Sequence, residues 1–309
     1  MSNHPELTRP EQSSSSVAPS AAVQTLFSYP QIRKLALFTG LLVLCFSKPL
    51  YDLIRFAVRS DLFSHVLLIP FISAYLVWLK RDSLRPGAPR SRGAAFGWAA
   101  AGLAVLIGYW LGARSGIIAG RLDYLAWTTF SFVLFFIGVC FWCLDRATLS
   151  AVAFPLGFLL FSAPFPHFMV HAIETFLQYT SALCAHLFFS LSGMSFIREG
   201  LMFQLPGIHL EVAPECSGIH STLVLFISSL VAGQLFLRSF TARTLLALAV
   251  IPLGILRNAF RIWTIGELCV HISPDMIESP IHTRGGPLFF ALSLIPLALF
   301  LIWLRNRSK

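Results

Sequence analysis

The 309-residue sequence contains few charged residues. Asp, Glu, Lys and Arg together make up 12% of the chain, about half of the roughly 25% found in soluble domains. Hydrophobic residues make up 56%. A soluble globule of this length could not cover its apolar surface with so few charges, so the composition argues against both a disordered chain and an ordinary soluble enzyme. We therefore expect most of the chain to lie in a lipid bilayer.

Acidic residues are scarcer than basic ones, 14 against 23, which gives a net charge of +9. Such an excess can indicate nucleic-acid binding. In membrane proteins, however, Lys and Arg collect in cytoplasmic loops and orient the chain, so we expect no nucleic-acid partner. The chain also lacks a cysteine framework. The pair Cys140 and Cys143 lies in an apolar run without a second pair, which favours buried, inert thiols.

Residues 1–30 are rich in Ser, Pro, Ala and Gln, which predicts a disordered N-terminal tail, and residues 31–309 are expected to form a single integral-membrane domain. No small-residue cleavage site follows the first apolar run, so we interpret it as a retained span. Apolar runs of the length needed to cross a bilayer occur at roughly 34–54, 62–79, 94–112, 124–144, 147–164, 216–236, 244–266 and 287–304. The predicted fold class is an all-α polytopic membrane protein with about eight transmembrane helices.

Two further segments are not expected to cross. In 167–192, the residues His167, His171, Glu174 and Gln178 recur at helical spacing and make one polar face. This pattern is typical of an amphipathic helix at an interface or beside a cavity. In 194–221, two short alternating runs flank Leu205-Pro206-Gly207, which predicts a β-hairpin or an extended loop at the membrane surface.

The basic residues orient the predicted spans. Their densest cluster, from Lys80 to Arg92, occupies one short loop, where the positive-inside rule is most reliable. Placing this loop in the cytoplasm predicts a multi-pass protein of the cytoplasmic (inner) membrane with both termini inside. Three polar segments then meet on the outer (periplasmic) face: 194–221, the end of the seventh span at 256–263, and the loop 271–286.

Cys216 is a candidate nucleophile. Pro214 is tolerated at the start of a helix, so we expect Cys216 in the first turn of the sixth span. Unpaired backbone N–H groups there favour an anion, and hence a thiolate. His220, four residues on, would lie over the thiol on the same helix face. The alternative is a packing cysteine near a helix start.

Arg257 and Arg261 lie four residues apart on one face of an otherwise apolar span. Inserting an arginine at membrane depth costs about 2.5–3.5 kcal/mol. We therefore expect each side chain to reach the headgroups, to pair with another group or to have a function in the site. An arginine beside a thiolate can hold it ionised or stabilise an oxyanion. His282, just before the last span, could act as a general acid or base, or could be a solvated loop residue. The spacing of Cys216 and the histidines matches no zinc motif, so we expect no metal and no other cofactor.

The stretches ECSGIHS, RNAFRI and IHTRGG, in this order, resemble the exosortase/archaeosortase family of polytopic membrane enzymes. In that family the presumed active site consists of the Cys of a C-S-G motif, the Arg of an N-x-x-R motif and a His before the last span. These positions match Cys216, Arg261 and His282 here. The run FPLGFLLFSAPFP at 154–166 is also similar to the family's central span.

The remaining motif positions are supporting candidates. Ser217 and Gly218 complete the C-S-G motif and Asn258 begins the N-x-x-R motif, whereas the resemblance assigns no role to Arg257. The resemblance implies a cysteine peptidase or transpeptidase acting at the outer face. Its substrates would be exported proteins ending in a sorting signal: a Pro-Glu-Pro-like motif, a transmembrane helix and a basic tail. The cleaved protein would pass to a lipid or glycan acceptor, in bacteria alongside exopolysaccharide production.

Two other classes of protein fit the sequence. A transporter or flippase for a lipid-linked saccharide would explain many spans and membrane arginines but gives Cys216 no role. A non-catalytic subunit of an exopolysaccharide or secretion machine would tolerate alanine at Cys216, Arg261 and His282.

Overall fold

The computed structural model describes residues 30–60, 62–81, 92–116, 118, 120–279 and 286–307. The predicted tail lies outside these residues, apart from Pro30, which begins the first helix. Short 3₁₀ turns are η1 (Ser64–Leu67), η3 (Leu159–Ser162), η4 (Pro214–Cys216) and η5 (Pro274–Glu278). The helices are α2 (Pro30–Cys45), α3 (Ser47–Arg59), α4 (Leu68–Leu79), α5 (Arg92–Arg114), α6 (Arg121–Cys143), α7 (Arg146–Phe158), α8 (His167–Leu191), α9 (Ile219–Phe236), α10 (Phe240–His271) and α12 (Gly286–Arg307).

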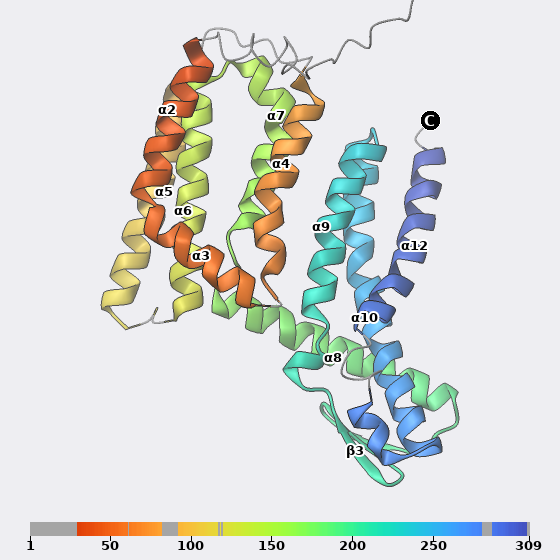
Figure 1. The fold of residues 1–309 in the computed structure, drawn as a ribbon. Helices are drawn as coiled ribbons and strands as arrows, with labels where there is room; N and C mark the ends of the chain where they lie inside the picture. The colour runs from red at the N-terminus through yellow and green to blue at the C-terminus, as the bar shows by residue number, and fades with distance from the viewer. Residues whose placement is uncertain are drawn as a thin grey trace, which may run out of the picture.

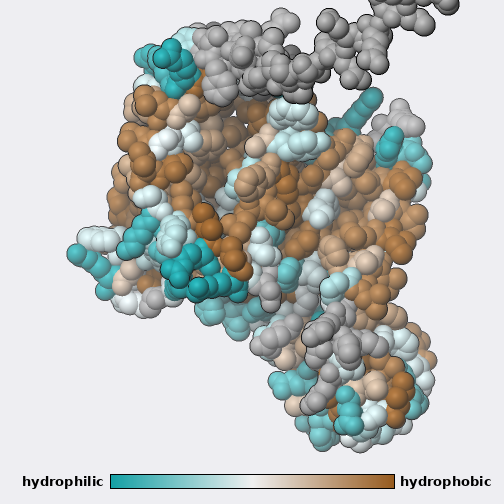
Figure 2. Space-filling model, in the orientation of Figure 1, coloured by the Kyte–Doolittle hydropathy of each residue, from teal (hydrophilic) through white to brown (hydrophobic). Residues whose placement is uncertain are grey.

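The described chain is a mainly α-helical bundle with an apolar outer surface and one small sheet. Five helices (α5, α6, α9, α10 and α12) are long and apolar enough to cross a membrane, and the count rises to seven if each of two bent helix pairs is one span. Figure 2 shows a broad hydrophobic surface over the upright helices, with polar groups gathered toward both ends. The polytopic class is confirmed, but the number eight is not.

The first expected span, 34–54, is not one continuous helix. It breaks at Phe46 into α2 and α3, which are bent by 73°. Phe46 packs on Phe132 and Phe135 of α6, with ring centroids 5.6 and 6.0 Å away. Beyond this anchor, Lys48 and the other charged residues of α3 give the helix a polar face. The chain turns aside because these charges are costly at membrane depth.

Helix α8 lies across the ends of the upright helices (Figure 1). It is bent by 91° from the segment Arg146–Ser162 that precedes it. The backbone N–H of His167 donates a hydrogen bond to the Asp123 carboxylate at 2.8 Å, which ties the start of α8 to α6. A separate helix was expected over 167–192, and α8 is one; together with the preceding segment it also passes, by length and composition, as a single bent span.

A small antiparallel sheet follows α8, with strands β1 (Ile197–Glu199), β2 (Met202–Leu205) and β3 (Ile208–Glu211) in sequential order. Pro206 and Gly207 form the turn between β2 and β3. Gly207 has φ of 82°, as a glycine following proline does in a type II turn. Strands β2 and β3 form the expected hairpin. The segment also contains a third strand, β1, which pairs with β2.

The sheet is held by a buried apolar cluster shared with α8 and α10. Phe189 of α8 and Phe203 of β2 are fully buried in it, with ring centroids 5.4 Å apart. Helix α10 reaches this cluster because it continues beyond the bundle (Figure 1). A Cβ at Gly266 of α10 would lie 2.5 Å from the Phe189 ring, so α10 packs directly on α8. One 32-residue helix thus joins the bundle to the lobe formed by α8 and the sheet.

The two described ends of the chain lie at the same end of the bundle, on opposite sides of it (Figure 1). The start of α2 and the end of α12 are at the same end of the bundle, opposite α8, the sheet and η4 (Figure 1). This arrangement agrees with the prediction that both termini share one side.

Phe189→Ala is expected to lower the free energy of unfolding by about 3–5 kcal/mol, because it opens a cavity in a fully buried cluster. Denaturant titration of the purified protein in detergent measures the change. Phe168→Ala is the matched control, since that side chain lies on the same helix and is 63% exposed. Equal losses in the two variants would contradict the assignment of Phe189 to the core.

Candidate active site

Cys216 ends a short turn and is not part of a long helix. The N–H of Cys216 donates to the Ala213 carbonyl at 2.9 Å, and that of Ser217 to the Pro214 carbonyl at 3.0 Å. Helix α9 begins only at Ile219, after Gly218 with φ of 73°. The expectation that Cys216 lies in the first turn of the sixth span is therefore wrong. A left-handed glycine redirects the chain, which separates the turn η4 from the helix.

Two side chains of α10 hold the turn η4 in place through hydrogen bonds to the backbone at Cys216 and Gly218. Asn258 donates from Nδ2 to the Cys216 carbonyl at 2.8 Å, across 42 residues of sequence. Arg257 donates from Nη2 to the Gly218 carbonyl at 3.2 Å and to the Thr222 hydroxyl at 3.1 Å. Both side chains are buried. The backbone on either side of Ser217 is thus fixed by buried polar groups, whose hydrogen bonds offset their cost in an apolar helix.

Gly218 is required here for two reasons. Its positive φ is one that residues with a Cβ rarely adopt. A Cβ would also lie 3.0 Å from Nη2 of Arg257 and 3.2 Å from Oδ1 of Asn258. The absence of a side chain therefore lets the turn approach α10 closely enough for both hydrogen bonds.

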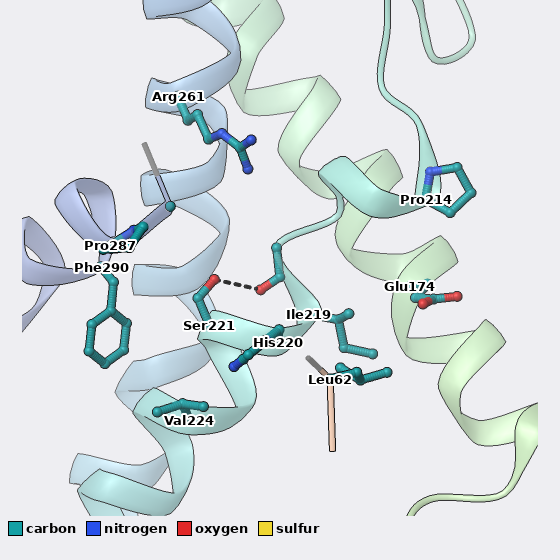
Figure 3. Close-up of a pocket in the computed structure, with 12 residues that line it drawn as sticks. Leu62, Glu174, Pro214, Ile219, His220, Ser221, Val224, Arg261, Pro287 and Phe290 are labelled. Atoms are coloured by element: carbon teal, nitrogen blue, oxygen red, sulfur yellow. Dashed lines mark hydrogen bonds between the residues drawn. The ribbon is translucent and has the colours of Figure 1, made fainter. Parts of the chain in front are cut away.

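Arg261 lies one helical turn beyond Arg257 and lines two cavities. The smaller, about 20 Å³, is also lined by Cys216 and Asn258. The larger, about 690 Å³, lies among α8, α9, α10 and α12, and its polar residues include Glu174, His220 and Ser221. Figure 3 shows Arg261 projecting from α10 toward the side chains of α9. Arg261 therefore belongs to the walls of both cavities, one holding the cysteine and the other large enough for part of a ligand.

His220 does not share a helix face with Cys216, because only His220 belongs to α9. The expectation of a shared face is wrong because Gly218, which lies between Cys216 and His220, separates the turn η4 from α9. His220 lines the larger cavity (Figure 3), whereas Cys216 lines the smaller one.

The other motif residues have different surroundings. Ser217 is buried, and its hydroxyl accepts a hydrogen bond from the Ile219 N–H at 3.4 Å, which fits a structural role in the turn. His282 lies outside the described residues. Gly286 and Pro287, which follow it in the sequence and begin α12, line the larger cavity.

Two residues of α8 were not predicted as site residues. Glu174 lines the larger cavity, and Gln178 donates to the Val212 carbonyl at 2.9 Å, just before the cysteine turn. Both belong to the polar face predicted over 167–192. That pattern predicted a cavity-lining or interfacial helix but not which cavity the face would line. Within the described ranges, no group of three or more His, Cys, Asp or Glu side chains is placed to hold a metal ion.

Gly218→Ala is expected to displace the cysteine turn, through both backbone strain of about 1–2 kcal/mol and the clash with α10. The rate at which a maleimide labels Cys216, followed by peptide mass spectrometry, reports this change. Gly193→Ala is the matched control: Gly193 has φ of 74° but open space around its Cβ position. If both variants label Cys216 at the wild-type rate, the close packing does not fix the turn.

Comparison with known proteins identifies the family. A search of curated proteins and of solved structures found no significant match. The family model described as transmembrane exosortase matches residues 57–299, a range that contains the cysteine turn, both arginines, the larger cavity and most of the bundle. Since the match covers most of the chain, this protein belongs to the transmembrane exosortase family.

Proposed function

We propose that this exosortase is a membrane-embedded cysteine peptidase or transpeptidase whose catalytic residues are Cys216, Arg261 and His282. The observation that carries the proposal is the contact between two distant motifs. The Cys216 backbone is held by Asn258, and Arg261, three residues after Asn258, lines a cavity together with Cys216. A cysteine so close to an arginine has a partner that can favour its thiolate form.

In the proposed reaction, the Cys216 thiolate attacks the carbonyl carbon of the scissile peptide bond. Arg261 stabilises the oxyanion that develops on the carbonyl oxygen. The tetrahedral intermediate collapses to a thioacyl-enzyme as the C–N bond breaks, and the imidazolium of His282 gives its proton to the leaving amine. His282 then takes a proton from the acceptor nucleophile, which attacks the thioester and releases Cys216 as the thiolate.

The substrates we propose are exported proteins with a C-terminal sorting signal, namely a Pro-Glu-Pro-like motif, a transmembrane helix and a basic tail. The acceptor would be a membrane lipid or a glycan. Two features support a peptide substrate. The larger cavity combines a carboxylate, an imidazole and a guanidinium with apolar walls, and its volume falls within the roughly 300–1,000 Å³ typical of ligand sites. It also lies beside apolar helices against which a substrate helix could pack.

The proposed site lies at the end of the bundle opposite the described chain ends (Figure 1). With both ends in the cytoplasm, as the basic residues predict, the reaction would take place at the outer (periplasmic) face of the cytoplasmic membrane.

Cys216→Ala is expected to reduce processing of a sorting-signal substrate by roughly 10⁴-fold or more, because no other group replaces the nucleophile. Co-expression of enzyme and tagged substrate, followed by immunoblotting for the cleaved form, measures the loss. Cys184→Ala is the control, since Cys184 is also a partly buried free thiol but lines neither cavity. Mass analysis of the new C-terminus distinguishes hydrolysis from transfer.

Two further experiments separate the other two classes of protein. A saccharide transporter or flippase would keep its function after a thiol reagent is added outside whole cells. An assembly subunit would tolerate alanine at Cys216, Arg261 and His282 together. Processing that persists in Cys216→Ala would show that the covalent scheme is wrong.

His282→Ala is expected to abolish substrate processing, whereas His220→Ala should lower it only in part, because His220 lines the larger cavity and not the one with Cys216. Steady-state processing rates of the two variants, at equal expression, give the comparison. Full activity of His282→Ala with loss in His220→Ala would transfer the acid–base role to His220.

A further inference from the structure

A further cavity lies in the bundle away from the proposed active site. We call it the α4–α7 groove: about 660 Å³, walled by α2, α4, α6 and the segment α7–η3, with Ser73, Ala74 and Trp78 on the α4 side. It shares no lining residue with the two cavities beside Cys216. In Figure 2 the hydrophobic surface is recessed between the columns formed by α2 and α4.

Two buried hydroxyl groups line this groove without a hydrogen-bond partner among the described residues: Oγ of Ser73 and Oγ1 of Thr148. Ser73 is 4% exposed and Thr148 is 5% exposed. Among the other described hydroxyls, Thr128 bonds to the Tyr124 carbonyl at 2.6 Å, whereas Thr129 and Ser181 are also buried without a partner but line none of the three cavities. An unsatisfied buried hydroxyl is costly. Ser73 and Thr148 differ from the other two because they line a groove, where a ligand with hydrogen-bonding atoms would satisfy them.

One end of the groove is cationic. Arg81 lines it, with its guanidinium 4.4 Å from the centre of the Trp78 ring. Lys80, which follows α4, donates to the Ala151 carbonyl of α7 at 2.7 Å. Arg33 and Lys34 at the start of α2, and Arg146 at the start of α7, occupy this same end of the bundle (Figure 1). The Asp145 carboxylate, at the start of α7, accepts hydrogen bonds from the N–H groups of Ala147 and Thr148.

These observations point to one class of occupant. We propose that the α4–α7 groove binds an anionic glycerophospholipid, with its acyl chains between α2 and α4, its ester oxygens near Ser73 and Thr148, and its phosphate at Arg81. The walls supply apolar contact, the hydroxyls donate to ester carbonyls, and the cationic end attracts the phosphate.

A transmembrane helix fits this groove less well. A helix satisfies its own backbone groups and so offers little to the two hydroxyls. A helix followed by a basic tail, as in the substrates proposed above, would also place its positive charges beside Arg81 and Lys80. The lipid site therefore does not depend on the proposed reaction, and it lies at the end of the bundle opposite Cys216.

The test uses the full chain reconstituted in bilayers that contain equal amounts of phosphatidylglycerol and phosphatidylethanolamine with matched acyl chains. Native mass spectrometry after release from the bilayer counts each lipid retained. The wild type should retain phosphatidylglycerol preferentially. Arg81→Gln should lower this preference about fivefold, the factor that corresponds to ~1 kcal/mol for one basic residue near a membrane surface. Arg238→Gln, a basic residue that lines a different cavity, is the matched control.

A second variant tests the acyl-chain site. Ala74 is exposed and lines the groove, so Ala74→Phe should fill it without disturbing the core and reduce retention of both lipids at least twofold. Ala104→Phe, at an exposed position of α5, is the control. Retention of the two lipids in bilayer proportion, or an unchanged preference in Arg81→Gln, would overturn the headgroup assignment. Equal retention by Ala74→Phe and Ala104→Phe, or a cross-link from position 74 to a peptide helix, would overturn the lipid site.

Discussion

The candidate site depends on buried polar side chains of a membrane helix that donate to the backbone of a turn. Arg257 and Asn258 are too polar to lie unpaired in an apolar helix. The Gly218 carbonyl also accepts from the Thr222 N–H at 3.0 Å and from the Ser221 hydroxyl at 3.1 Å, and the Cys216 carbonyl accepts from the Asn258 amide at 2.8 Å. The two side chains gain partners for their donors, and their hydrogen bonds hold the cysteine turn at a defined place on α10.

Helix α10 makes this arrangement possible because it belongs to two parts of the molecule. Near its middle, Gly254 packs on Thr222 of α9, and further along Gly266 packs on Phe189 of α8. Arg257, Asn258 and Arg261 lie between these two close contacts. They are therefore placed where the upright bundle meets the lobe formed by α8 and the sheet. The larger cavity opens at this junction because α8 runs across the helix ends and does not continue the bundle.

The sequence predicted which motif residues meet better than it predicted their local geometry. Its motifs identified Cys216, Arg261 and Asn258, and these do come together, but the helix start was placed three residues too early. Proline signals where a helix can begin, whereas the left-handed conformation of Gly218 depends on the packing of Arg257 and Asn258 against it. Likewise, the sequence predicted one span over 34–54, whereas the chain bends at Phe46, where this ring packs on α6 and the charged face of α3 begins.

What the sequence determined by itself was set by local composition: apolar runs long enough for a membrane, the polar face of 167–192, and the family to which the motifs belong. Hydropathy and helical period are read over neighbouring residues, so one chain suffices for them. Only the tertiary structure decided that the Asn258 amide holds the Cys216 carbonyl, that His220 and Cys216 line separate cavities, and that Ser73 and Thr148 line a groove beside Arg81. These are contacts between residues tens of positions apart, and they follow from how whole helices pack.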